Sequence, residues 1–458
     1  MATQAPTMLD LPPGPRQPRY AQALQWVMRP QEFVVRQRER FGDVFTLEFI
    51  DGQPLVFLSD PEDIRTVFTG SAEVMHAGEA NKVLAPILGS RSILLLDEAE
   101  HLRQRRLLLP PFHGERMLRY EAIMAEAAER ELATWQEGET IEMLPRMQAL
   151  TLEVIMRAVF GIEDGLEMER LRTLLRTMLQ ATTDMRQMAL SLIMGPESER
   201  LQQRLRKVLD PVDAELYRVI AEHRDAPDLE AREDILSMLL LARDEDGEPM
   251  TDLELRDELM TLLLAGHETT ASSLSWAFEQ MTHQPQTLER LTEELRAGGG
   301  DEPYAEAVIQ ETMRLRPVLP IVIRLLKEPI TVGQGRFRLP AGTRVAPAII
   351  LVHLRDDIYP DPYEFRPERF IETPPGTYTW IPFGGGMRRC VGSAFAQFEM
   401  RAVLRAVLTN FDIESDGGPE RIARRSLTIV PDHGGRVRLV RRVKSASFEA
   451  TAQGALAL

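Results

Sequence analysis

The chain has 458 residues, 44% of them hydrophobic and 27% charged, which is the composition of an ordinary globular protein. Its net charge of −16 disfavours nucleic acid as a partner, and its single cysteine excludes a disulfide framework and multi-cysteine zinc or iron–sulfur sites. The sequence has no run of 18 apolar residues, so no membrane span is predicted, and a cytoplasmic location is expected. Length alone predicts two or three domains.

Taken in chain order, the pattern is mainly helical with a minor set of short strands. Residues 1–10 are expected to be flexible, as is the tail at 445–458. Charged, periodic stretches predict helices at 116–136 and 210–224. Runs that favour extended backbone predict strands at 44–50, 54–58, 330–339, 344–347 and 436–440.

The longest predicted helix covers residues 251–284. Thr251 and Glu254 have the spacing of a capping box at its start, and Pro285 is expected to end it. About 34 residues at 1.5 Å each would span roughly 50 Å, the width of a whole domain. Small, apolar and hydroxyl side chains recur on one face at helical spacing. On periodicity alone, this pattern indicates a core helix with a close-packing glycine at Gly266.

The single cysteine, Cys390, follows three consecutive glycines and precedes a predicted helix at 391–408. Its sulfur would lie at a helix N-terminus, where free N–H groups and the charges of Arg388 and Arg389 favour a thiolate. A lone cysteine is more often a buried structural residue. Here the glycines, the arginines and the helix start together favour a functional thiolate.

Five residues around the cysteine fit one spaced pattern, F-x-x-G-x-R-x-C-x-G: Phe383, Gly386, Arg388, Cys390 and Gly392. This pattern resembles that of the cytochrome P-450 superfamily of haem-thiolate monooxygenases, in particular its soluble bacterial members. AGHETT at 265–270, ETMR at 311–314 and PERF at 367–370 resemble that family's other motifs in the same order. The resemblance implies one triangular, mainly α domain with a small β region over residues 11–444, in place of the domain number that length predicts.

The resemblance assigns Cys390 as the axial ligand of iron in haem b. A thiolate ligand pushes electron density to iron and favours O–O cleavage. Phe383 would pack beside the sulfur, while Gly386 and Gly392 would let the chain approach the ring. The candidates for the two haem propionates are Arg388, His101, Arg105 and Arg324. Without the cysteine motif, the basic helix that carries His101 and Arg105 would be interpreted as a solvated face.

The resemblance also assigns two further groups of residues. Glu311, Arg314 and Arg369 would form a buried structural triad that supports the haem loop. Thr269 and Glu268 would be the catalytic distal pair, in which a hydroxyl holds a water and a carboxyl connects it to solvent. Thr269 would also bond the carbonyl of the residue four positions earlier, and Gly266 would leave room for dioxygen.

A lipophilic substrate is expected above the haem, because the candidate walls are mostly aliphatic. Each wall residue is equally plausible as ordinary core. AGHETT resembles the segment of many lipid hydroxylases, which favours a fatty acid, a terpenoid or a polyketide-like molecule. The candidate walls are Leu262, Leu263, Ala265, Val318, Leu319, Ile321 and Ile429.

No flavin or nicotinamide domain is recognisable after the cysteine motif. We therefore expect electrons from a separate ferredoxin or flavodoxin with its reductase, docking on Arg103, Arg106 and Arg389 of a monomer. Two alternatives keep the haem: a peroxide-driven peroxygenase, which Glu268 and Thr269 disfavour, and a non-enzymatic haem-binding sensor. A third alternative is a helical binding protein with an inert cysteine.

Overall fold

The structure is a computed structural model that describes residues 11–49, 52–112, 114, 116–161, 165–183 and 199–442. The two expected flexible ends, 1–10 and 445–458, lie outside these residues. The helices are α1 (Arg19–Met28), α2 (Pro30–Phe41), α3 (Pro61–Thr69), α4 (Ala85–Leu88), α5 (Glu98–Leu108), α6 (Arg116–Leu132), α7 (Met143–Phe160), α8 (Leu166–Thr183), α10 (Glu199–Arg224), α11 (Ile235–Leu241), α12 (Asp252–Thr282), α13 (Pro285–Ala297), α14 (Pro303–Leu315), α15 (Ile349–Val352), α16 (Glu368–Glu372) and α17 (Ser393–Asn410). The strands are β1 (Val44–Glu48), β2 (Pro54–Leu58), β3 (Met75–His76), β4 (Thr140–Glu142), β5 (Arg324–Leu326), β6 (Ile330–Val332), β7 (Phe337–Leu339), β8 (Arg344–Pro347), β9 (Phe411–Ser415), β10 (Ile422–Arg425), β11 (Thr428–Pro431) and β12 (Arg436–Arg442).

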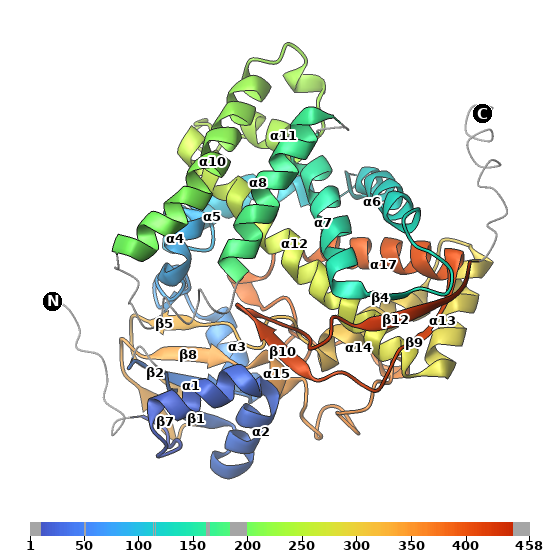
Figure 1. The fold of residues 1–458 in the computed structure, drawn as a ribbon. Coiled ribbons are helices and arrows are strands. Elements are labelled where there is room, and N and C mark those ends of the chain that lie inside the picture. The colour runs from blue at the N-terminus through green and yellow to red at the C-terminus, as the bar shows by residue number, and fades with distance from the viewer. Residues whose placement is uncertain are drawn as a thin grey trace.

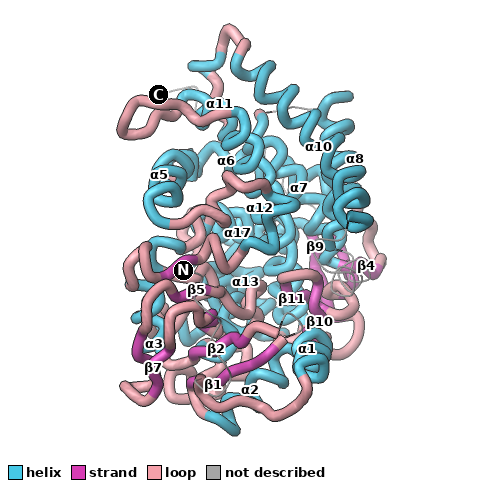
Figure 2. The backbone as a smooth tube through the Cα atoms, turned by 90° about the vertical axis from the view of Figure 1, so that its left-hand side faces the viewer, coloured by secondary structure: helices cyan, strands magenta, loops and turns pink. Residues whose placement is uncertain are grey.

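The helices and strands occupy different parts of the molecule. Figure 1 shows the larger sheet at the lower left, beneath a helical body that tapers toward α10 and α11. Figure 2 shows the same separation from the side, with the magenta strands gathered in the lower half. The mainly α fold class is confirmed. None of the described helices is both long enough and apolar enough to cross a bilayer.

Helix α12 runs through the middle of this body (Figure 1). Its first turn has the predicted capping box: Thr251 Oγ1 accepts from the Glu254 N–H at 3.2 Å, and Glu254 accepts from the Thr251 N–H at 2.8 Å. The helix ends at Thr282, and Pro285 opens α13. Because α7, α10, α14 and α17 pack around it, α12 is buried on most sides and serves as the central core element.

The larger sheet has the strand order β1-β2-β8-β5-β3, with β2 and β8 parallel and the other pairs antiparallel. The strands predicted at 54–58 and 344–347 have the predicted bounds. The single strand predicted at 330–339 is wrong, because this stretch is the hairpin of β6 and β7. Its turn contains three residues with positive φ, Gly333, Gln334 and Gly335, and this backbone conformation interrupts a strand.

Candidate active site

The loop before α17 brings Cys390 to the start of that helix. Gly384 and Gly386 have φ values of +66° and +63°. A Cβ atom on Gly386 would come within 1.8 Å of the Phe68 carbonyl oxygen, and one on Gly385 within 2.2 Å of the Phe68 ring. These two glycines are therefore needed where the loop packs on the end of α3. A Cβ atom on Gly392 would meet nothing within 4 Å, so this glycine borders open space beside the cysteine.

Cys390 is fixed by backbone hydrogen bonds on both sides. Its N–H donates to the Phe383 carbonyl at 3.0 Å, and the N–H of Gly392 donates to its sulfur. The side chain is accessible to solvent, yet protein atoms surround it closely, and this burial raises the pKa of the thiol. The Gly392 N–H and the charges of Arg105 and Arg389 oppose that rise. A bound cation is what would convert this thiol fully to a thiolate.

Four basic side chains gather beside this loop: His101 and Arg105 from α5, Arg324 from β5, and Arg388 from the turn before Cys390. Burial and then the neighbouring guanidinium groups lower the pKa of His101 to about 3. Burial and the charge of Arg388 lower the pKa of Arg324 to about 10. Asp97 offsets part of the charge, because it accepts from Arg388 at 2.6 Å. The cluster therefore keeps an excess of buried positive charge.

This donor set fits a haem. A thiol at a helix N-terminus can bind iron, and the excess of buried positive charge matches two carboxylates, the number of propionates on the ring. A Cβ atom on Gly392 would meet no atom within 4 Å, so the chain leaves space next to the cysteine for such a group. Arg388 also ties the loop to the segment before α5, through Asp97 and the Ile93 carbonyl at 3.1 Å.

The expected triad is assembled behind the cysteine loop. Arg314 Nε donates to Glu311 at 2.6 Å, Arg369 Nε donates to the same carboxylate at 3.0 Å, and Glu311 and Arg314 have no exposed surface. Arg314 also donates to the His353 carbonyl at 2.8 Å, and the His353 ring accepts from the Ile381 N–H at 2.9 Å. The triad is thereby connected to the first residues of the cysteine loop.

The middle of α12 presents its side chains to two different surroundings. Thr269 Oγ1 donates to the Ala265 carbonyl at 2.6 Å, as the spacing predicts, and Ala265 is exposed although it lies in the middle of a core helix. A Cβ atom on Gly266 would lie 3.1 Å from Ile155 of α7. This glycine lets α12 approach α7, as the close-packing interpretation predicts, and its expected role of leaving room for dioxygen stays a prediction.

Glu268 turns toward a cavity of about 430 Å³ lined by α6, α7, α8, α12 and β10. Its carboxylate accepts from Gln148 Nε2 at 2.8 Å and lies 3.3 Å from Arg425 Nε. Burial raises the pKa of Glu268, while Arg425 and Gln148 oppose the rise. A carboxyl in such surroundings can take a proton from the cavity and release it on the helix side.

The family model for cytochrome P450 matches residues 12–437. The chain belongs to the cytochrome P450 family. It is 42% identical over 455 residues to putative cytochrome P450 135B1 of Mycobacterium tuberculosis, covering 98% of this chain and 95% of that protein. It is 37% identical to putative cytochrome P450 137 of the same organism, over 95% and 92% of the two chains.

Two solved structures share the fold. Cyanobacterial CYP120A1, solved with retinoic acid bound, superposes with a TM-score of 0.81 at 26% identity, covering 94% of this chain and all of that one. The haem domain of cytochrome P450DA superposes with the same TM-score at 22% identity, covering 95% and 98%. The single-domain cytochrome P450 fold is therefore confirmed, and this chain is a haem-thiolate monooxygenase.

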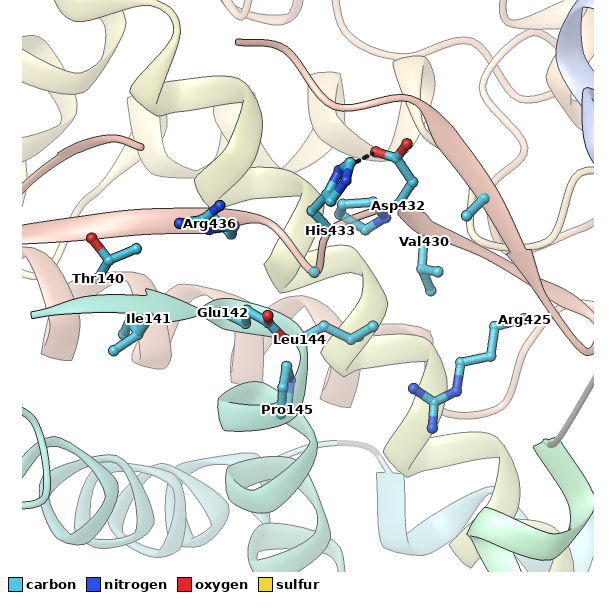
Figure 3. Close-up of a pocket in the computed structure, with 13 residues that line it drawn as sticks. Thr140, Ile141, Glu142, Leu144, Pro145, Arg425, Val430, Asp432, His433 and Arg436 are labelled. Atoms are coloured by element: carbon cyan, nitrogen blue, oxygen red, sulfur yellow. Dashed lines mark hydrogen bonds and ion pairs between the residues drawn. The ribbon is translucent and has the colours of Figure 1, made fainter. Parts of the chain in front are cut away.

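Sequence reasoning about this cytochrome P450 missed Arg425 and Gln148, the two partners of Glu268. Arg425 lies between two cavities, because it also lines one of about 600 Å³ bounded by β4, the start of α7 and the β10–β11 hairpin. Figure 3 shows Arg425 at the edge of that second cavity, with its guanidinium turned toward α12. No local motif contains these residues, and Gln148 lies 120 positions from Glu268.

A second buried carboxyl lies on the far side of α12. Glu399 of α17 is 1% exposed and accepts from the Thr270 hydroxyl. Burial holds the pKa of Glu399 well above its usual value, which favours the protonated carboxyl. Thr270 thus links α12 to α17, the helix that follows Cys390.

The candidate pocket walls fall into two groups. Leu263, Val318 and Ile429 are buried, and the backbone N–H of Ile429 donates to the Val318 carbonyl. The remaining side chains keep accessible surface: Leu262, Ala265, Leu319 and Ile321.

The proposed docking arginines differ in their surroundings. Arg103 pairs with Asp244 and Glu254, and Arg106 pairs with Glu245. Their charges are therefore already compensated within the chain, whereas Arg389 beside the cysteine is exposed.

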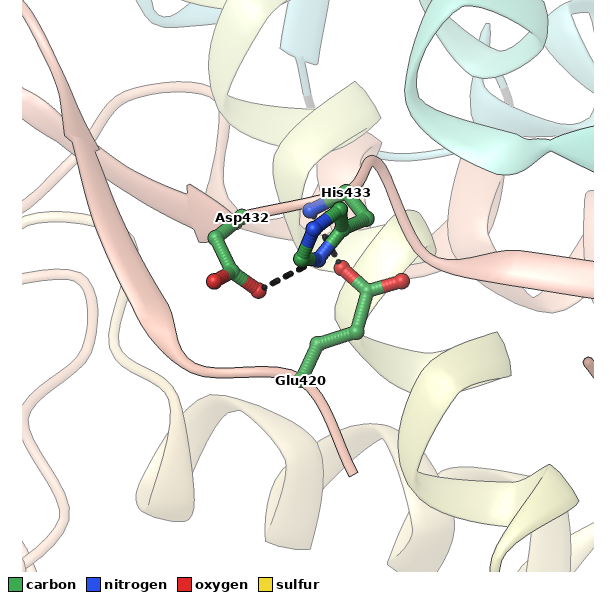
Figure 4. A group of neighbouring side chains, drawn as sticks. All are labelled: Glu420, Asp432 and His433. Atoms are coloured by element: carbon green, nitrogen blue, oxygen red, sulfur yellow. Dashed lines mark hydrogen bonds and ion pairs between the residues drawn. The ribbon is translucent and has the colours of Figure 1, made fainter. Parts of the chain in front are cut away.

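Glu420, Asp432 and His433 lie together at the base of the β10–β11 hairpin (Figure 4). Glu420 accepts from the N–H groups of His433 and Arg436, at 2.7 and 2.9 Å. Asp432 accepts from the Arg421 N–H and from the His433 ring. Because the chain's own donors use these oxygens, the cluster holds the hairpin in shape.

Proposed function

We propose that this cytochrome P450 inserts one oxygen atom of dioxygen into a lipophilic substrate, in a hydroxylation or an epoxidation. The observation that carries the proposal is the distal pair: a buried carboxyl at Glu268 facing a cavity, next to a hydroxyl at Thr269 on the accessible side of α12. Fatty acids, terpenoids and polyketide-like molecules are the proposed substrates. The retinoic acid bound to CYP120A1, an apolar carboxylic acid, supports this class.

The proposed cofactor is haem b. Cys390 is the only cysteine in the chain, so the thiol that ligates iron leaves none to bind the ring covalently. When bound, haem supplies the iron that binds and activates dioxygen. Cys390 Sγ would ligate that iron, and the propionates would be held by His101, Arg105, Arg324 and Arg388.

The protein's own part in the reaction is the delivery of protons. Water in the cavity of about 430 Å³ can protonate Glu268, whose orientation Arg425 and Gln148 fix. The Thr269 hydroxyl donates its hydrogen to the Ala265 carbonyl. Its oxygen can therefore accept a hydrogen bond from a water on the accessible side of α12. A proton then passes from the Glu268 carboxyl to that water.

Electrons would come from a separate ferredoxin or flavodoxin, docked beside Cys390 at the exposed Arg389. We also propose that the protein works in the cytoplasm as a monomer. A cytoplasmic location would keep the Cys390 thiol reduced.

The test compares Thr269→Ala with Thr282→Ala. Both hydroxyls lie on α12 and donate to the carbonyl four residues earlier, at 2.6 and 2.9 Å, but only Thr269 belongs to the site. With dioxygen, a reductase and a substrate, Thr269→Ala is expected to divert electrons from product to hydrogen peroxide, while Thr282→Ala behaves as wild type.

Two results would overturn the proposal. Full turnover with peroxide alone, and none with dioxygen and a reductase, would identify a peroxygenase. A haem protein that binds gases but oxidises no lipophilic substrate would identify a sensor.

A further inference from the structure

The outer face of α1 carries a row of exposed large apolar side chains. Tyr20, Leu24 and Met28 follow one another at intervals of four residues, so they lie on one side of the helix. Their exposed fractions are 60%, 62% and 66%. No two of the other exposed large apolar residues in the described chain are three or four positions apart, and single exposed residues need no explanation.

The inner face of α1 holds the helix in this orientation. Trp26 packs edge-on against the Phe57 ring at 6.0 Å, and the guanidinium of Arg424 lies over its indole at 5.0 Å. Gln22 is 2% exposed, donates to the Gln17 carbonyl at 2.9 Å and accepts from the Glu48 N–H at 3.1 Å. A satisfied polar group therefore lies inside while the apolar row faces out, so the helix cannot bury that row by turning.

The segment that carries α1 has a charge opposite to that of the chain as a whole. Residues 11–31 contain three arginines, Arg16, Arg19 and Arg29, and no acidic residue. All three are exposed, two before the apolar row and one after it. The chain as a whole has 70 acidic residues and a net charge of −16, so this local excess of positive charge favours an anionic surface.

We propose that α1 docks on the surface of an anionic lipid bilayer. Leu24 and Met28 would enter the boundary between headgroups and acyl chains, and Tyr20 would lie at headgroup level, where tyrosine is enriched. The arginines at the two ends would contact lipid phosphates. A helix of 10 residues is only about 15 Å long, which is too small for a stable protein interface of roughly 800 Å² per partner.

The test is co-sedimentation of the full-length holoprotein with vesicles of phosphatidylcholine alone or with 30% phosphatidylglycerol added, at low and high salt. The test variant is Leu24→Gln combined with Met28→Gln. The matched control is Val83→Gln, because Val83 is another exposed aliphatic residue, at 74%. We expect wild type and the control to bind the anionic vesicles at low salt, and the double variant to bind at least tenfold less.

Binding that is equal for wild type and the double variant would overturn the proposal, as would no binding to either vesicle. A dimer in sedimentation velocity that the double variant abolishes would identify a second copy as the occupant instead. Vesicle binding that appears only after removal of residues 2–10 would identify that segment as the occupant of the apolar row on α1. The retained haem spectrum shows that each variant is folded, and no outcome depends on substrate turnover.

Discussion

Replacing Arg425 with glutamine tests the physical account of proton delivery. Arg425 Nε lies 3.3 Å from the Glu268 carboxylate, which is 7% exposed. An arginine this close to a carboxyl lowers its pKa by about 1–3 units, and the partial exposure of Arg425 favours the low end. Glutamine removes the charge, so the pKa of Glu268, already raised by burial, should rise by a further unit or so.

A rise of one pKa unit lowers the ionised fraction of Glu268 about tenfold at any pH below that pKa. The pH profile of product formed per electron pair should therefore move to higher pH by about one unit in Arg425→Gln. Arg425→Lys keeps the charge and should therefore give a pH profile close to that of wild type. The carboxyl stretching band of Glu268, assigned by its loss in Glu268→Gln, reports the same titration without turnover.

One result would refute this reasoning: a pH profile and a carboxyl titration that stay within 0.3 units of wild type in Arg425→Gln, about the error of such a comparison. Arg421→Gln is the matched control, because Arg421 also belongs to this hairpin region but pairs with Asp432 at the surface. It should leave the titration of Glu268 unchanged.

Three further predictions follow from the buried groups. Cys390→Ser should remove the strongly red-shifted Soret band of the reduced, carbon monoxide-bound protein, and an unchanged spectrum would exclude Cys390 as the ligand. Glu311→Ala leaves the fully buried Arg314 without its carboxylate, which should cost about 3–5 kcal/mol of unfolding free energy in denaturant titration; a loss below 1 kcal/mol would contradict the role of the triad. Burial raises the pKa of Glu258 to about 8, so the stability it contributes is full below pH 4.5 and is lost as pH rises toward 8. Glu258→Gln should therefore gain stability relative to wild type between pH 5 and pH 8, and a difference that is constant with pH would show that Glu258 does not titrate there.

The sequence predicted the parts of the site that short motifs carry. The residues around Cys390, the segment at 265–270 and the triad each depend on spacing within a few positions, and the capping box of α12 depends on two residues three positions apart. Local spacing reports local geometry, so these elements could be located before the fold was known.

Other features depend on which distant segments meet. The partners of Glu268 come from α7 and β10, and no spacing near Glu268 indicates them. Helices surround α12, so periodicity alone does not show which of its faces meets α7, and the contact between Gly266 and Ile155 is visible only in the fold. The carboxylates that compensate Arg103 and Arg106 are likewise far away in sequence.

The presence of a single thiol also determines how oxidation can crosslink this protein during storage. Any disulfide between two copies must join Cys390 to Cys390, because no other sulfhydryl exists in the chain. Such a crosslinked dimer would have lost the proposed iron ligand in both halves. The dimer band on a non-reducing gel would therefore measure the fraction of inactivated protein. A reducing agent in storage would keep Cys390 Sγ free, and so would preserve both cofactor binding and the monomeric state.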